Sequence, residues 1–132
     1  MCAKELATIF AHFAQETGAN DPSGGATGGV TEKWRQGLYW LTEIYCSPGG
    51  GGAGSVGCNY FSTGWSATAF PRPNTTVQYY GRGAKQLSWN YNYGPFSKVM
   101  YGDKSVLLNN PEKVADEGWL AISSAFWFYT TP

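Results

Sequence analysis

Residues 79–94 read Tyr-Tyr-Gly-Arg-Gly-Ala-Lys-Gln-Leu-Ser-Trp-Asn-Tyr-Asn-Tyr-Gly. Turn residues bracket the run 77–87, and its two glycines favour a short β-hairpin that turns at residues 81–83. Ser88 has a hydroxyl suited to capping a helix N-terminus, which predicts a helix from there to Met100. The stretch therefore predicts a small hairpin joined directly to a helix.

Helical spacing of apolar residues recurs on both sides of this stretch. Residues 3–17 form an apolar stripe of Leu6, Ile9, Phe10 and Phe13, and Gly18 ends it. Residues 32–45 repeat the spacing with Trp34, Leu38, Leu41 and Tyr45, and residues 112–129 are apolar around most of the circumference of a helix. Residues 19–29 and 47–73 are rich in turn residues and predict loops. The chain is expected to be mainly helical.

Composition excludes several classes of protein. The 132 residues predict a single domain, and 17% aromatic against 14% charged residues are typical of a packed core. A net charge of zero argues against a nucleic-acid partner, and no apolar run is long enough to span a membrane. The lone histidine and three cysteines lack the spacing of a zinc site, so we expect no metal and no cofactor.

Other catalytic and nucleotide motifs are incomplete. Gln86 occupies the third glycine position of a dinucleotide loop that would begin at Gly81, and no Gly-x-Ser-x-Gly elbow accompanies His12. We therefore expect neither a nucleotide site nor a serine hydrolase.

The cysteines predict one disulfide. Cys46 and Cys58 flank the glycine-rich run 47–57, a loop that a disulfide could close, whereas Cys2 stands alone. Three reduced thiols remain the alternative. A disulfide and the glycosylation sequon at Asn74 both favour an extracellular location.

Two glutamates have positions that suit acid–base chemistry. Glu16 follows the apolar stripe of the first predicted helix, where partial burial would favour the protonated form that a general acid needs. Glu43 lies three and four residues after Trp40 and Tyr39. Paired carboxylates among aromatic rings are typical of glycoside hydrolases, whereas the plainer interpretation makes both of them solvated surface residues.

The run 79–94 strongly resembles the signature of the family 19 glycoside hydrolases, the plant-type and bacterial chitinases. Residues 14–18 resemble the family's His-Glu-Thr motif, residues 37–43 lie where the family keeps its second carboxylate, and residues 108–111 and 125–128 resemble its later blocks. The resemblance implies a mainly α (α+β), lysozyme-like fold with two helical lobes and a small β-hairpin.

The resemblance also implies a mechanism. It makes Glu16 the general acid and Glu43 the general base of an endo-acting, inverting chitinase, with Ser88 holding the attacking water. Gln86, Tyr91 and Asn92 match positions that line the sugar cleft. A secreted monomer that cleaves chitin is expected, and residues 1–132 are expected to form one chitinase-type catalytic domain, possibly incomplete.

Two alternatives remain open at this point. The same fold and carboxylate pair serve endolysins that cleave peptidoglycan. A non-catalytic chitin-binding relative is the other, because Gln15 replaces the family's histidine and Ala84-Lys85 replaces its Pro-Ile.

Overall fold

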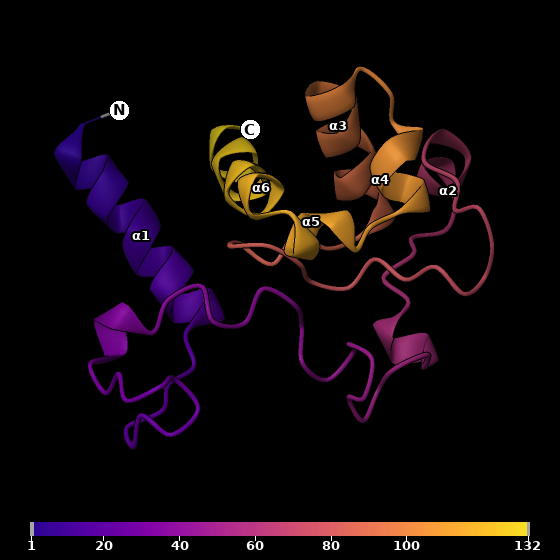
Figure 1. Ribbon diagram of the computed structural model, residues 1–132. Helices are drawn as coiled ribbons and strands as arrows, with labels where there is room; N and C mark the ends of the chain where they lie inside the picture. Colours follow the sequence, from indigo (N-terminus) through magenta and orange to yellow (C-terminus); the bar gives the residue numbers. More distant parts are fainter. Residues whose placement is uncertain (1, 132) are drawn as a thin grey trace. The chain divides into compact units, whose positions relative to one another are not determined.

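The computed structural model describes residues 2–131. The side chain of Trp34 lies outside the described part, and so does the apolar contact predicted for it. The chain divides into two compact units, Met1–Leu41 and Thr42–Pro132. Both are built mainly from helices and loops (Figure 1). The mainly helical class expected from the sequence is confirmed.

The first unit is built on helix α1, Ala3–Thr17, whose predicted bounds are confirmed. Its apolar stripe buries Ile9 and Phe13, whereas Phe10 stays half exposed. The carboxylate of Glu5 accepts a hydrogen bond from the Cys2 amide, which satisfies one of the free donors at the helix N-terminus. Periodicity alone therefore placed this helix.

The helix predicted for residues 32–45 is wrong. Only a single turn forms, the 3-10 helix η1 at Lys33–Arg35, and Leu38 has a left-handed φ of 63°. Beyond this turn the backbone bonds to α1 instead of to itself, because the amides of Leu38 and Trp40 donate to the hydroxyl and carbonyl of Thr17, each at 2.8 Å. Tertiary hydrogen bonds have replaced the helical ladder.

The second unit holds the principal core. Its helices are α2 (Trp65–Ala69), α3 (Asn90–Tyr101), α4 (Ser105–Asn109), α5 (Lys113–Asp116) and α6 (Gly118–Thr130), with a 3-10 turn η2 at Val56–Cys58. Helix α3 packs against α2 and α4, and α5 against α6 (Figure 1). Buried side chains of these helices and of the segment before α3 form one cluster: Tyr79, Leu87, Tyr93, Phe96, Leu107, Leu108, Val114 and Leu120.

Details of the predicted elements differ in this unit. Helix α3 begins after Trp89, not after Ser88, whose hydroxyl donates to the carbonyl of Gln86 instead of capping the helix. The buried helix predicted for 112–129 is split into α5 and α6 by the extended Glu117, and several aromatic rings of α6 stay exposed. The predicted loop 47–73 contains η2 and α2 but is otherwise irregular.

The predicted hairpin is not confirmed. Within residues 2–131 no strand forms, and the run contributes only isolated antiparallel bridges from Arg82 to Thr42 and to Leu87. Arg82 and Leu87 exchange two backbone hydrogen bonds of 3.1 and 2.8 Å, so the chain turns at residues 83–86 and not at 81–83.

The predicted disulfide is confirmed, since Cys46 and Cys58 are bonded. Both are buried, whereas Cys2 is a free and exposed thiol. Two of the glycines between the cysteines lie tightly against their neighbours. A Cβ atom on Gly50 would come within 2.1 Å of the Ile44 carbonyl oxygen, and one on Gly52 within 2.2 Å of the Tyr45 ring. Neither position has room for a side chain.

Candidate active site

Glu43 lies just after the Thr42 bridge, at the start of the second unit, and its side chain is half buried. The hydroxyl of Tyr60 donates to its Oε1 at 3.1 Å, and the amide of Gly81 donates to its Oε2 at 3.2 Å. The Glu43 amide donates to the Gly81 carbonyl at 2.8 Å in return. Both carboxylate oxygens are therefore held by donors while part of the group faces water.

The environment of Tyr60 reflects this contact. Burial, and then the hydrogen bond to Glu43 and its negative charge, raise the pKa of Tyr60. The phenol therefore stays protonated near neutral pH and remains a donor to the carboxylate. The Sγ atom of Cys46 also lies 3.4 Å from Oε1 of Glu43, but a disulfide sulfur carries no proton, so this is a packing contact.

Gln86 lies against Gly81, whose amide bonds to Glu43. A Cβ atom on Gly81 would come within 2.8 Å of Oε1 and 3.2 Å of Cβ of Gln86, so the Gln86 side chain would have to shift to admit one. Gln86 has a left-handed φ of 55°, and its side-chain amide donates to the Gly83 carbonyl at 3.2 Å. The tight turn that follows Arg82 thus brings Gln86 beside the residue that holds Glu43.

Ser88 and Asn92 continue from Gln86 through hydrogen bonds. The Ser88 hydroxyl donates to the Gln86 carbonyl at 3.1 Å, and the Asn92 side-chain amide donates to the Ser88 carbonyl at 2.9 Å. All three side chains are half buried. The structure therefore brings together Glu43, Gln86, Ser88 and Asn92, which are four of the six predicted site residues.

A row of aromatic rings connects Glu43 to the start of α3. Tyr60 meets Trp89 edge to face at 5.4 Å between ring centroids, and Trp89 stacks on Tyr91 at 5.7 Å with 16° between the ring planes. Trp89 reaches this position with a left-handed φ of 73°, which is unfavourable for a bulky residue. Tyr91, the fifth predicted site residue, therefore belongs to the same cluster.

A cavity of about 410 Å³ lies at the far side of this cluster. Tyr91 and Asn92 of α3 form one wall, and Trp127, Phe128 and Thr131 at the end of α6 form the other. Aromatic surface with a polar edge is the composition that sugar rings favour.

Glu16 belongs to the first unit, in the last turn of α1, and its side chain is exposed. The burial within α1 that the sequence suggested for this carboxylate is therefore wrong, because the apolar stripe ends at Phe13 and Thr17. Glu43 is likewise not on a helix with Trp40, so its predicted aromatic neighbours are replaced by Tyr60 and Trp89.

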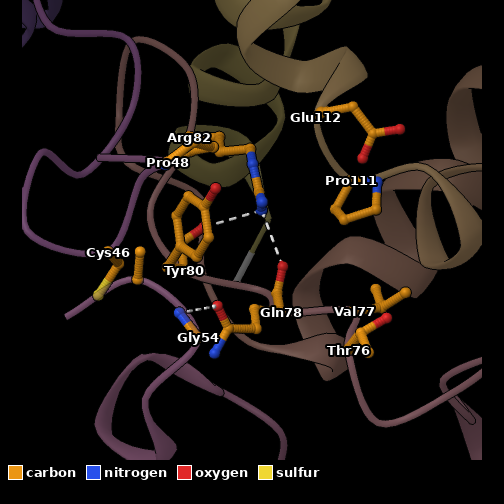
Figure 2. Close-up of a pocket in the computed structure, with 11 residues that line it drawn as sticks. Cys46, Pro48, Gly54, Thr76, Val77, Gln78, Tyr80, Arg82, Pro111 and Glu112 are labelled. Atoms are coloured by element: carbon orange, nitrogen blue, oxygen red, sulfur yellow. Dashed lines mark hydrogen bonds between the residues drawn. The ribbon is translucent and has the colours of Figure 1, made fainter. Parts of the chain in front are cut away.

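A second cavity, of about 430 Å³, lies beside the segment 76–82 (Figure 2). The guanidinium of Arg82 projects into it between Tyr80 and Gln78, and Glu112 lies on the opposite wall. Cys46 of the disulfide lines its edge.

The sequence of residues 2–132 matches the family described as chitinase class I. The chain belongs to the class I chitinase family. The resemblance inferred from residues 79–94 is confirmed, and it extends over nearly the whole chain.

Individual relatives give the same result. Endochitinase CHI of Arabidopsis thaliana is 38% identical over 137 residues, which cover 97% of this chain and 36% of the relative. Endochitinase CH25 of Brassica napus is 34% identical over 132 residues, covering 98% and 33%. Endochitinase B of Nicotiana tabacum is 33% identical over 134 residues, also covering 98% and 33%. The chain spans about a third of the length of these relatives.

Two features of this candidate site escaped sequence reasoning. Tyr60 is 17 residues from Glu43 in an aperiodic loop, and no spacing rule connects them. The Gly81 amide is a backbone donor, which a sequence does not reveal. The signal that the sequence does offer is the pair of glycines on either side of Arg82, since glycine often marks a close approach of the backbone to another group.

Among residues 2–131 no group of three or more His, Cys, Asp or Glu side chains is arranged to hold a metal ion. None of the helices described is both long and apolar enough to cross a bilayer.

Proposed function

We propose that this chain hydrolyses the β-1,4 linkages between N-acetylglucosamine units of chitin, with inversion at the anomeric carbon. Glu16 is the general acid that protonates the glycosidic oxygen as the bond to the anomeric carbon breaks. Glu43 is the general base that takes a proton from the water attacking that carbon from the opposite face. No cofactor takes part.

The observation that carries this proposal is the environment of Glu43. A general base must be held in a fixed direction and within reach of a water, and hydrogen bonds to both carboxylate oxygens restrict the rotation of the group. Tyr60 and Gly81 supply these bonds, and partial exposure leaves the carboxylate able to reach a water. Each carboxylate oxygen has a further lone pair, so holding the group does not exhaust its capacity to accept.

Ser88 is the second partner proposed for the attacking water. Its hydroxyl donates to the Gln86 carbonyl, which leaves the oxygen lone pairs to accept a hydrogen bond from water. Ser88 contacts Gln86, which lies against Gly81, and Glu43 bonds to the Gly81 amide. A water accepted by both residues would be oriented for attack.

The sugar chain is proposed to bind along the aromatic cluster. Trp89 and Tyr91 offer ring faces, and Gln86 and Asn92 offer amide groups for hydroxyl and acetamido groups. The cavity between α3 and α6 extends this surface. The three relatives named above are all endochitinases, which supports an internal cleavage site and chitin as the polymer.

Hydrolysis of soluble chitohexaose tests the proposal, with the anomer of fresh product followed by NMR. We expect α-anomer product from the wild type, and loss of nearly all turnover in Glu16→Gln and in Glu43→Gln with substrate binding retained. Glu32→Gln is the matched control, because this exposed glutamate forms only a surface ion pair with Arg35 at 3.6 Å. Initial β-anomer product would refute inversion.

Parallel assays separate the remaining alternatives. Turnover of peptidoglycan without turnover of chitin would identify a cell-wall endolysin. Binding of chitohexaose by a folded wild type that hydrolyses neither polymer would identify a chitin-binding relative.

We also propose that the chain acts outside the cell as a monomer. A disulfide persists in oxidising compartments, and the sequon residue Asn74 is exposed. Light scattering of the purified protein tests the monomer, and detection of glycan on Asn74 in protein from its native source tests export.

A further inference from the structure

Arg82 is an almost fully buried cation, with 4% of its surface exposed. Within residues 2–131 it forms no ion pair with a carboxylate, although burying a charge is unfavourable unless other groups replace its hydration. The steps proposed for hydrolysis do not use this residue. Its contacts therefore need another explanation.

The partners of the guanidinium are mostly its own neighbours in sequence. Its Nη1 atom donates to the carbonyls of Gln78 and Tyr80 at 3.0 and 3.4 Å and to the Tyr93 hydroxyl at 3.0 Å. The guanidinium carbon lies 3.7 Å from the centroid of the Tyr80 ring. Figure 2 shows the two carbonyl contacts. Residues 78–82 are thus folded around the end of their own arginine side chain.

Gly81 lies inside this folded segment, and both of its backbone polar groups pair with Glu43. The backbone of Arg82 itself bridges Thr42 on one side and Leu87 on the other. A guanidinium that ties together the carbonyls of 78 and 80 therefore restrains the one amide that holds Oε2 of Glu43. The Tyr93 hydroxyl links this segment to α3, because it accepts from the Arg82 guanidinium and donates to the Tyr80 carbonyl at 2.9 Å.

We propose that Arg82 is a positioning residue that fixes Gly81, and through Gly81 the direction of the Glu43 carboxylate. The inference rests on the function proposed above, in which Glu43 is the base. Arg82 does not touch the reacting atoms in this account. It acts by holding the segment whose amide the carboxylate requires.

The cavity beside Arg82 makes a direct test possible. Its volume of about 430 Å³ is several times that of a guanidinium ion, and the Arg82 side chain forms part of its wall. In Arg82→Ala the cavity would extend to the carbonyls of Gln78 and Tyr80, which would lose their donor. A free guanidinium ion at millimolar concentration could then occupy the vacated place and donate to both.

We expect Arg82→Ala to lower kcat for chitohexaose about 100-fold, because displacing a reacting group by about 1 Å has an effect of this size. KM should change little, since the residue is not among those proposed to bind sugar. Guanidinium should restore much of the lost kcat, and Arg82→Lys should retain an intermediate value. Arg72→Ala is the matched control: it removes a guanidinium that packs on the Phe61 ring and bonds to Asn59, and guanidinium should not raise its activity.

A double variant separates positioning from general stability. In a Glu43→Gln background the base is already lost, so adding Arg82→Ala should reduce the residual kcat no further. A further reduction of the same size as in the wild type would overturn the proposal. Failure of guanidinium to restore any activity to a folded Arg82→Ala would also overturn it.

Amide hydrogen exchange at Gly81 tests the inference without any turnover. We expect exchange at this amide to quicken in Arg82→Ala and to slow again when guanidinium is added, whereas amides of α4 stay unchanged. If Arg82→Ala does not fold, Tyr93→Phe removes one partner of the guanidinium and should quicken exchange to a smaller extent. Unchanged exchange at Gly81 would refute the restraint, and absence of hydrolysis by the wild type would refute only the proposed function.

Discussion

Breaking the Cys46–Cys58 disulfide has an effect that can be worked out from the loop it closes. The two cysteines are 12 residues apart. Releasing a loop of this length gives the unfolded chain conformational entropy worth about 3 kcal/mol at room temperature. Reduction of the wild type should therefore lower the free energy of unfolding of the second unit by this amount, which is roughly a hundredfold change in its unfolding equilibrium.

Urea unfolding followed by tryptophan fluorescence measures this difference in a Cys2→Ala background, which removes the free thiol and prevents disulfide exchange. Oxidised and reduced samples of this variant isolate the crosslink, because both keep the buried sulfur atoms. Cys46→Ala with Cys58→Ala should lose somewhat more, since it also removes those atoms from sites only 3% and 1% exposed. A change below about 1 kcal/mol on reduction would refute the entropic argument.

Three further predictions concern single residues. Tyr60→Phe removes a donor to the candidate base and should lower kcat by about 10-fold to 100-fold, as expected for a hydrogen bond to a charged group, with the fold checked by circular dichroism. Gly94→Ala should destabilise the protein by about 2 kcal/mol in urea unfolding, because its Cβ would lie within 2.2 Å of the Phe70 ring, whereas Gly118→Ala, which meets nothing within 4 Å, should not. Burial raises the pKa of Tyr93 to about 12 from a model-compound value of 10.0, so the unfolded chain loses this proton first: stability should be complete below pH 10 and fall as pH rises from 10 towards 12, and Tyr93→Phe should reduce that fall.

Local signals in the sequence predicted the features that depend on local interactions. Helix α1 follows from a repeated apolar spacing, and its bounds match because Gly18 ends the pattern where α1 ends. The disulfide follows from two cysteines that flank a run of small residues. Both depend on residues close together in the chain.

Predictions failed where distant groups compete for the backbone. Residues 32–45 have helical spacing, but Thr17 offers a hydroxyl and a carbonyl to the amides of Leu38 and Trp40, and these bonds prevail. Ser88 has the side chain of a cap, yet its hydroxyl bonds back to Gln86 because the chain turns sharply there. A single sequence carries no record of such competition.

The candidate site was predicted in identity but not in arrangement. Resemblance to a family supplied Glu43, Ser88 and Asn92 by position, whereas the partners that hold Glu43 came only from the structure. Tyr60 reaches the carboxylate across an irregular loop, and Gly81 contributes through its backbone. Spacing rules describe neither kind of contact.

The glycine tract between the cysteines has a consequence for how the chain tolerates mutation. Four consecutive glycines look like a linker, in which both composition and length vary freely. Here Gly50 and Gly52 fit against the Ile44 carbonyl and the Tyr45 ring with no space for a methyl group. A mutational scan should therefore find these two positions as intolerant as core residues. Insertion of a single extra glycine should be as harmful as a substitution, because it places other residues against the Ile44 carbonyl and the Tyr45 ring.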